Sequence, residues 1–333
     1  PWSQMQTSPI VNADHIVALS KYGANIISPL VNRTVDYIWH GVNTDILKQY
    51  PAEVKHKLRM QSTGGKFDQD SFVAGWVGKN QYRKQNDQLF IYAHYMVHGD
   101  YITCNDCHKV TIKEWDITKG CTKDIKDLTM YEEGYDYRSC SHCGSRLITE
   151  GKPNPKFYLY THMPFIPTDP WNPNALLHFY KVNGHVISTK DISINRGLDE
   201  KSMPNVYNMF DIMFYPTGGE GFGMPVLEAA ACGVPTLYSN YSAHAEVCKD
   251  IGIPLKVSYV TEMASQYLRA RVDMNHAIEK TNDIIKDRSI LKPFIERGLR
   301  KASENTWDII GQRWLKYIDD VASKCNNAIG VIV

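Results

Sequence analysis

Short apolar runs, glycine-rich turns and longer segments with helical spacing alternate along most of this chain. The pattern is clearest in DIMFYPTGGEGFGMPVLEAAACGVPTLY, residues 211–238. It predicts a buried strand over Ile212–Tyr215, a glycine turn, a helix over Met224–Cys232 and a second strand over Val234–Tyr238. Pro225 fits the first turn of that helix, where its missing N–H is not needed. Strand, turn, helix and strand in this order are typical of a parallel α/β sheet.

The same spacing predicts further elements on both sides of this segment. Buried strands are expected at the end of residues 12–20 and over Val35–Trp39, Phe72–Gly78, Phe157–His162 and His185–Ser188. Helices are expected from Lys21 to Ile27 and over Asp87–Val97, Ala175–Lys181, Pro204–Phe210, Ser242–Cys248, 263–280, 288–302 and 305–323. Strands that alternate with helices predict a Rossmann-like α/β fold.

The glycine turn carries the first candidate chemistry. A strand followed by such a turn and a helix places free backbone N–H groups at the carboxyl edge of a parallel sheet, where anions bind. Glu220 lies in the turn, and Glu228 lies about two helical turns further on. Carboxylates accept hydrogen bonds from sugar hydroxyls, so phosphate and sugar sites together indicate a nucleotide sugar. The alternative is a solvent-facing Glu220 and a helix-surface Glu228 beside an ordinary turn.

The segment GEGFGMPVLEAAACGVP, residues 219–235, resembles the E-x7-E segment of retaining GT-B glycosyltransferases, especially glycosyltransferase family 4. The resemblance implies that Glu228 holds the ribose hydroxyls of the donor and that Glu220 meets the donor hexose. It also implies retention of the anomeric configuration and no metal at the reaction centre. The other implied donor-binding residues are Gly78, Gly219, Gly221, Phe222, Gly223, Met224 and Pro225.

Arg83 and Lys84 follow the predicted strand Phe72–Gly78, where the family has a basic pair that binds the donor diphosphate. Arginine binds phosphate through two parallel hydrogen bonds, and lysine supplies a point charge. The resemblance implies that both neutralise charge on the leaving diphosphate, and with Glu220 they are the candidate catalytic residues. The alternative is a solvated basic pair in a strand-to-helix loop. The segment Ile187–Ile194 is implied to contact the nucleobase.

The resemblance extends to HGVNTDIL, His40–Leu47, which matches the close of the family's first Rossmann-like domain. About 60 residues precede the second domain, whereas a typical domain has about 100–150. The chain is therefore interpreted as a fragment, in keeping with Pro1 as its first residue, or as dependent on a partner for that half. The predicted organisation is an N-terminal remnant (1–60), a nucleotide-sugar-binding domain (61–98 and 151–303), an insertion (99–150) and a C-terminal helix that returns to the N-terminal part (304–333).

Two CxxC pairs lie in the insertion, Cys104 with Cys107 and Cys140 with Cys143. Disulfides are disfavoured in the cytosol, so two such pairs predict a tetrahedral zinc site in a zinc-ribbon-like fold. Four cysteine ligands leave no open coordination position, which predicts a structural zinc rather than a catalytic one. Cys121 lies between the pairs and is an alternative ligand with a less suitable spacing.

Other interpretations of the cysteines remain open. The sequence Cys104–His108 also fits the C-x-x-C-H haem attachment pattern, but haem attachment would require export and would leave the second pair unexplained. A redox CxxC pair would not require the duplicate. A zinc ribbon that binds nucleic acid is the third alternative, and the mixed charge of the insertion disfavours it. Cys232, Cys248 and Cys325 are expected to fill the core.

Length and composition agree with an α/β enzyme. The 333 residues give room for two domains with a substantial core. With 37 basic and 36 acidic residues, the chain gives no electrostatic reason to expect binding to nucleic acid or to an anionic membrane. No apolar run approaches the length of a membrane span, and the start of the sequence lacks a signal pattern. A cytoplasmic protein is expected.

The sequence thus predicts a retaining, hexosyltransferase-like enzyme that moves a sugar from a nucleotide-diphosphate sugar to an unidentified glycan, lipid or protein acceptor. The alternative is a catalytically incomplete donor-binding or scaffold protein whose zinc module contacts a partner chain. The two differ in whether the isolated chain turns over a sugar nucleotide or only binds one.

Overall fold

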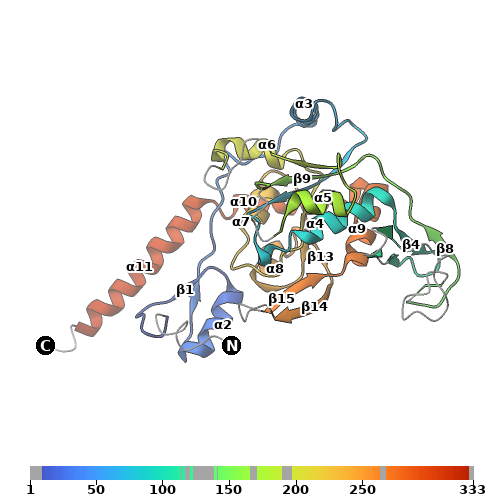
Figure 1. Ribbon diagram of the computed structural model, residues 1–333. Helices are drawn as coiled ribbons and strands as arrows, with labels where there is room; N and C mark the ends of the chain where they lie inside the picture. Colours follow the sequence, from blue (N-terminus) through green and yellow to red (C-terminus); the bar gives the residue numbers. More distant parts are fainter. Residues whose placement is uncertain are drawn as a thin grey trace.

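The structure is a computed structural model of the chain. It describes residues 10–113, 115–116, 121–122, 139–140, 142–165, 171–189, 197–262 and 268–329. A six-stranded sheet in the order β10-β9-β3-β11-β12-β13 forms its centre, and every neighbouring pair is parallel (Figure 1). The strands are β3 (Phe72–Val77), β9 (Phe157–His162), β10 (Val186–Ser188), β11 (Ile212–Tyr215), β12 (Thr236–Ser239) and β13 (Gly252–Leu255).

The order of the strands places helices on both faces of the sheet. The chain passes from β3 outward to β9 and β10, returns to β11 on the other side of β3, and then passes outward to β12 and β13. Right-handed crossovers in opposite directions place their helices on opposite faces. The first excursion carries α4 (Asp87–His98) and α5 (Pro173–Phe179), and the second carries α7 (Met224–Ala231) and α8 (Ser242–Cys248). The connections therefore reverse direction between β3 and β11, which is the switch point at which α/β sheets bind ligands.

Further helices complete the two layers. The helix α9 (Met274–Lys286) packs beside α4, and α10 (Lys292–Ser303) packs against α7. The short helix α6 (Met203–Tyr207) precedes β11. Single 3-10 turns are η1 (Tyr82–Lys84), η3 (Glu200–Ser202) and η4 (Arg288–Leu291). Strands β3, β11 and β12 are buried along their whole length, as the continuous apolar runs of a doubly covered parallel sheet predict.

The N-terminal part forms a small layer of its own. Strands β1 (Val17–Ala18) and β2 (Asp36–Tyr37) pair in parallel beside α2 (Lys21–Val31). Their core is separate from the main one and is built on Ala18, Ala24 and Val35. The helix α3 (Ala52–Thr63) leads from this layer to the main sheet, and α11 (Trp307–Ile329) extends away from the body of the molecule (Figure 1).

The insertion follows α4 and lies at the opposite side of the molecule from α11 (Figure 1). Strands β4 (Tyr101–Cys104), β5 (Val110–Ile112) and β8 (Ile148–Glu150) form an antiparallel sheet with β4 in the middle. A second antiparallel pair consists of β6 (Trp115–Asp116) and β7 (Cys121–Thr122). The side chain of Cys121 lies outside the described part of the chain, so its place as an alternative ligand stays a prediction.

The predicted helix over 263–280 is wrong at Leu268–Val272. Residues 263–267 lie outside the described ranges, and Leu268–Val272 forms strand β15, antiparallel to β14 (Val257–Glu262). Ala270 and Val272 are buried and alternate with arginines, so the local period is two rather than 3.6. The helix begins only at Met274, after the side chain of Asp273 accepts a hydrogen bond from the N–H of His276 at 3.2 Å.

The predicted strand over Val35–Trp39 is shorter than expected. Only Asp36 and Tyr37 are in strand conformation, and both are exposed. The predicted burial is confirmed for Val35 and Ile38, which lie on either side of these two residues. Cys232 and Cys248 are fully buried, as predicted for core-filling cysteines. None of the helices in the described ranges combines the length and apolar content that a membrane crossing requires.

A glycine in β3 provides a test of the core. A Cβ atom at Gly75 would overlap the ring of Phe210, which is fully buried. We expect Gly75→Ala to lower the free energy of unfolding by about 1–3 kcal/mol, because overpacking displaces the ring. Urea denaturation measures this change.

The matched control is Gly311→Ala in α11, where a Cβ atom meets nothing within 4 Å. Alanine in place of a helical glycine should raise the free energy of unfolding by about 0.5–1 kcal/mol. A Gly75→Ala variant with an unchanged urea midpoint would contradict this account of the core.

Candidate functional site

The loops that follow β3 and β11 meet at the switch point of the sheet. The first contains η1, and the second is the glycine turn from Thr217 to Gly223. The N–H of Gly218 donates to the carbonyl of Arg83 at 2.8 Å, and the hydroxyl oxygen of Thr217 lies 3.2 Å from the same carbonyl oxygen. These contacts fix the backbone of one loop against the other. Side chains of the two loops, which are distant in sequence, therefore lie close together.

Glu220 is at the centre of this cluster of side chains. Its Oε2 contacts Arg83 Nη1 at 2.5 Å, and its Oε1 contacts Lys84 Nζ. The hydroxyls of Tyr215 and Thr217 each donate to Oε1 at 3.1 Å. The three predicted catalytic residues therefore lie together. The Glu220 side chain is only 7% exposed, so this carboxylate is a buried charge with two cationic partners.

The electrostatics favour an ionised Glu220. Burial alone would raise the pKa of its carboxyl, but the charges and hydrogen bonds of Lys84 and Arg83 outweigh burial and lower that pKa from its usual value. Burial lowers the pKa of the Lys84 ammonium, and Glu220 opposes that shift. Lys84 Nζ also donates to the hydroxyl of Tyr215 at 2.9 Å. The side chain of Arg83 is 37% exposed, which leaves Arg83 the more accessible of the two cations.

A network of hydrogen bonds around His244, on β12 and α8, supports the glycine turn. The backbone N–H of Glu220 donates to the hydroxyl of Ser242 at 3.0 Å, and that hydroxyl is 3.1 Å from His244 Nδ1. His244 Nε2 is 2.8 Å from the hydroxyl of Ser239, which donates to the carbonyl of Thr217 at 2.5 Å. Burial lowers the pKa of His244 to about 4, so its ring is neutral at pH 7. The sequence patterns did not identify this network.

Strand β15 closes the turn from another side. The N–H of Ala270 donates to the carbonyl of Gly218 at 3.1 Å, and the carbonyl of Ala270 accepts from Gln85 Nε2 at 2.6 Å. A Cβ atom at Gly218 would overlap Gln85 Nε2. This position requires glycine because three segments converge on it.

Glu228 lies on α7 and has different contacts from Glu220. The hydroxyl of Tyr207, on α6, donates to Glu228 Oε2 at 2.5 Å. Burial raises the pKa of the Glu228 carboxyl, and the hydrogen bond from Tyr207 only partly opposes that shift. The structure thus separates the two carboxylates by their environment: Glu220 is paired with cations, and Glu228 is held by a neutral phenol.

The start of α7 is shaped by a left-handed glycine. Gly223 is the N-cap with φ of 99°, and a Cβ atom there would lie 3.0 Å from the Cβ of His244. Met224 and Pro225 form the first turn, and no side chain of the described residues caps this helix. An uncapped helix start offers backbone N–H groups to an anion.

The other predicted donor residues lie around the same loops. Gly78 follows β3, and its N–H donates to the carbonyl of His162 at 3.3 Å. The carbonyl of Gly219 accepts from Arg83 Nη1 at 3.3 Å. A Cβ atom at Gly221 would meet nothing within 4 Å, so this side of the turn is open. Of the predicted base-contacting segment Ile187–Ile194, only residues 187–189 are described.

The N-terminal layer packs against the turn through contacts that the sequence did not predict. The hydroxyl of Ser20 donates to the carbonyl of Gly221 at 3.1 Å. The rings of Trp39 and His40 contact Phe222, with centroid separations of 5.7 and 5.3 Å. The layer therefore forms one wall beside residues predicted to bind the donor.

Glu246, on α8, fixes this layer in position. Its carboxylate accepts from the N–H groups of Lys21 and Tyr22, at 3.1 and 2.8 Å, and from Trp39 Nε1 at 2.8 Å. A carboxylate at the start of α2 is also favoured by the helix dipole.

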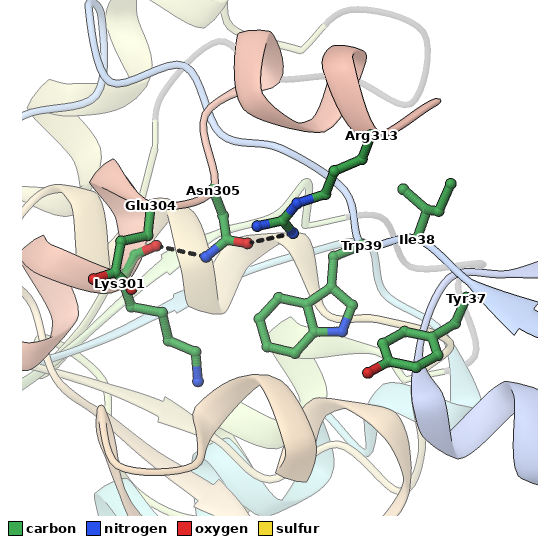
Figure 2. A pocket seen from close by; sticks show the side chains of 7 residues that line it. All are labelled: Tyr37, Ile38, Trp39, Lys301, Glu304, Asn305 and Arg313. Carbon is green, nitrogen blue, oxygen red and sulfur yellow. Dashed lines mark hydrogen bonds between the residues drawn. The ribbon is translucent and has the colours of Figure 1, made fainter. Parts of the chain in front are cut away.

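A cavity of about 340 Å³ lies between the N-terminal layer and the helices α10 and α11 (Figure 2). Asn305 accepts from Arg313 Nη1 at 3.3 Å and donates to the carbonyl of Lys301 at 2.8 Å. Lys301 Nζ lies 5.2 Å from the ring centre of Trp39. The cavity is lined by Tyr37, Ile38, Trp39, Lys301, Glu304, Asn305 and Arg313.

The amino ends of the strands hold a second cavity, of about 510 Å³. Two of its lining cations, Arg59 and Arg288, contact Asp211 at 3.0 and 3.2 Å. The guanidinium charges there are already partnered by a carboxylate of the protein. The carboxyl edge, with its glycine turn and uncapped helix, is the better candidate for a ligand site.

Comparisons with known proteins indicate the class of protein to which this chain is similar. Residues 189–301 match the family model described as Glycosyl transferases group 1. The O-antigen chain mannosyltransferase B of Escherichia coli is 28% identical over 109 residues, and the match covers 33% of this chain and 25% of that protein. The match thus spans a quarter of the length of this curated relative.

Solved structures with low sequence identity share the fold. The structure of Anabaena HepE in complex with UDP and glucose has a TM-score of 0.63 at 13% identity, covering 96% of this chain and 68% of that one. Sucrose-phosphate synthase from Thermosynechococcus elongatus has a TM-score of 0.64 at 14% identity, covering 96% of this chain and 61% of that one. Together with the parallel sheet, these neighbours confirm the predicted GT-B fold.

The buried cluster around Glu220 gives a stability prediction. In a Lys84→Met variant, Glu220 keeps only Arg83 as a cationic partner, so we expect the free energy of unfolding to fall by about 3 kcal/mol. The double variant Lys84→Met with Glu220→Gln should regain part of this loss, because the buried carboxylate with only one cationic partner is gone. Urea denaturation at pH 7 measures both, and equal losses in the single and double variants would contradict the role given to the ion pair.

Proposed function

Because residues 189–301 carry a glycosyl transferases group 1 domain within a GT-B fold, we propose that this chain transfers a sugar from a nucleotide-diphosphate sugar to an acceptor. We expect retention of the anomeric configuration, as the E-x7-E segment implies. The observation that carries the proposal is the cluster of Glu220, Arg83 and Lys84 at the switch point of the sheet. The names of the relatives support it, since one is a mannosyltransferase and another was solved with UDP and glucose.

Arg83 is the residue proposed to meet the donor diphosphate. Its contacts to Glu220 and Gly219 both use Nη1, and its side chain is partly exposed. A guanidinium carries five N–H donors, so the same group can hold Glu220 and bind a phosphate. Because Glu220 fixes its position, the positive charge is placed before the reaction begins. Fixed charge of this kind stabilises the negative charge that develops on a leaving diphosphate.

Lys84 has a different part in the same proposal. It is only 8% exposed and lies between Glu220 and the hydroxyl of Tyr215. We assign it to electrostatic stabilisation through this buried pair, with less direct contact to the donor than Arg83 has. Glu220, whose Oε2 has Arg83 as its side-chain partner, is proposed to accept a hydrogen bond from a hydroxyl of the donor hexose through that oxygen.

Glu228 is proposed to bind the ribose hydroxyls of the donor. One oxygen is engaged by Tyr207. The other oxygen has no side-chain or backbone partner within hydrogen-bonding distance among the contacts of the described residues. The uncapped start of α7, with the turn from Gly219 to Gly223, would supply N–H groups to the diphosphate and the sugar.

A second candidate function is a donor-binding or scaffold protein. The apolar side chains of Leu315 and Ile318 on α11 are 56% and 54% exposed, which fits a helix that contacts another protein surface. Under this alternative the chain binds a nucleotide sugar without turning it over. The release of free nucleotide diphosphate in the presence of candidate acceptors distinguishes catalysis from binding alone.

Replacement of Glu228 tests the donor site. In Glu228→Gln the amide oxygen can accept from Tyr207, but the group facing the ribose becomes a donor. We expect the dissociation constant to rise about tenfold to a hundredfold, because a hydrogen bond to a charged group contributes about 1.5–3 kcal/mol. Isothermal titration calorimetry with UDP-glucose, GDP-mannose, ADP-glucose and TDP-glucose measures the change for the donor that the wild-type protein binds.

The control for this test is Glu296→Gln, which makes the same substitution on an exposed position of α10. Its affinity should equal that of the wild type. If the Glu228→Gln variant bound the donor with unchanged affinity, Glu228 would not be part of the donor site.

The raised pKa of Glu228 predicts how affinity depends on pH. Hydrogen bonds from ribose hydroxyls favour the ionised carboxyl, so donor binding lowers this pKa relative to the free protein. Affinity is therefore full above the pKa of the free protein and falls as pH decreases through it, by up to about tenfold per pH unit. Because burial raises that pKa, the fall should begin above the range where an ordinary glutamate, with a pKa of about 4.3, titrates.

Titrations between pH 8 and pH 5 measure this dependence, with Glu228→Gln as the comparison. In the variant, donor affinity should lack the part of the decrease with falling pH that comes from protonation of Glu228. Identical pH profiles for the two proteins would show that ionisation of Glu228 does not contribute to binding.

A further inference from the structure

Four cysteines of the insertion converge at one point, away from the loops of the candidate donor site. Cys104 and Cys107 come from the end of β4 and the turn after it, and Cys140 and Cys143 come from a second turn before β8. The sulfur atoms of Cys104 and Cys143 are 3.6 Å apart, and those of Cys107 and Cys140 are 3.5 Å apart. All four sulfur atoms lie within 4.8 Å of one another.

The two turns are built alike. In each, a backbone N–H points at the first sulfur of the pair: Cys107 N to Cys104 Sγ at 3.5 Å, and His142 N to Cys140 Sγ at 3.4 Å. Each turn then closes through a residue with positive φ. These are His108, at 59°, whose N–H donates to the carbonyl of Cys104, and Gly144, at 73°, whose N–H donates to the carbonyl of Cys140. Two such turns facing each other present four sulfurs to a common centre.

The distances distinguish a metal site from disulfides. A disulfide requires about 2.05 Å between sulfurs, and all four cysteines are free thiols here. Tetrahedral zinc with Zn–S bonds of about 2.3 Å places its sulfurs about 3.8 Å apart, close to the two separations observed. We propose that Cys104, Cys107, Cys140 and Cys143 bind one Zn²⁺. We further propose that the zinc-bound insertion acts as a brace, in the sense that its contacts restrict the movement of the donor-site loops.

The brace begins with contacts between the insertion and α9. Lys109 Nζ contacts Glu279 at 3.2 Å, and the N–H of Ile112 donates to Asn275 Oδ1 at 2.7 Å. The amide of Asn282 donates to the hydroxyl of Tyr101 at 3.1 Å. Lys109 lies two residues after Cys107, so the metal fixes the turn that carries this contact.

The brace continues from α9 into the candidate site. Strand β15 ends at Val272, two residues before α9 begins. Its Ala270 is hydrogen-bonded to Gly218 in the glycine turn and to Gln85 in the loop after β3. Arg271 contacts Asp87 at 2.7 Å at the start of α4. A fixed insertion thus limits the movement of α9 and β15, and β15 in turn limits both loops that hold Glu220.

The metal content tests the first half of the proposal. Wild-type protein purified from zinc-supplemented medium should contain about one zinc per chain by mass spectrometry of the metal, and Cys140→Ser should contain almost none. The matched control Cys121→Ser, which removes the other cysteine of the insertion, should keep the metal. A wild-type protein without zinc, or a Cys140→Ser variant with full zinc content, would contradict the assignment of these four cysteines as a zinc site.

Hydrogen exchange tests the brace and requires no sugar nucleotide, so it is independent of the proposed function. Zinc is removed from the wild-type protein with a chelator, which avoids variants that fail to fold. We expect faster exchange at the amides of Ala270 and Gly218 and unchanged exchange at Leu237 in β12. Restored zinc should restore protection. Equal exchange at Ala270 and Gly218 with and without zinc would overturn the brace, even if the metal is bound.

Discussion

The constraint on which the site depends is the burial of one carboxylate. Glu220 is nearly inaccessible to solvent, and an ionised group in that position is tolerated only when charges and hydrogen bonds compensate it. Arg83 and Lys84 supply the charges, and Tyr215 and Thr217 supply hydrogen bonds. Arg83 and Lys84 follow β3, whereas Tyr215 ends β11 and Thr217 follows it. The cluster therefore also joins the ends of two neighbouring strands at the switch point of the sheet. The geometry proposed to receive a diphosphate follows from that requirement.

Support for this cluster comes from segments that are far apart in the sequence. Ser239, Ser242 and His244 hold the turn from the side of β12 and α8. Ala270 holds it from β15, and Ser20 holds it from the N-terminal layer. A turn rich in glycine has little rigidity of its own, so its shape is determined by these neighbours. The N-terminal layer, which Glu246 fixes in position, belongs to this support.

Part of this arrangement could be predicted from the sequence. The strand Ile212–Tyr215 and the helix from Met224 were identified because an apolar run, glycines and a proline mark their ends locally. The pairing of Glu220 with Arg83 could not follow from periodicity, because it depends on which strands are neighbours. It was approached only through the family resemblance. Strand β15 was mistaken for helix because its arginines alternate with buried residues over only five positions, beside a true helix. The roles of Tyr207 and His244 depend on burial and on contacts between elements, which single-sequence patterns do not contain.

The central claim is that the carboxyl edge of this sheet binds a nucleotide-diphosphate sugar. The most direct measurement is the melting temperature of the chain in the presence of UDP-, GDP-, ADP- and TDP-sugars, since a ligand that binds only the folded state raises it by mass action. The account predicts a concentration-dependent rise with the sugars of one nucleotide class, and that class identifies the base. An unchanged melting temperature with every sugar at concentrations far above ordinary dissociation constants would contradict the claim.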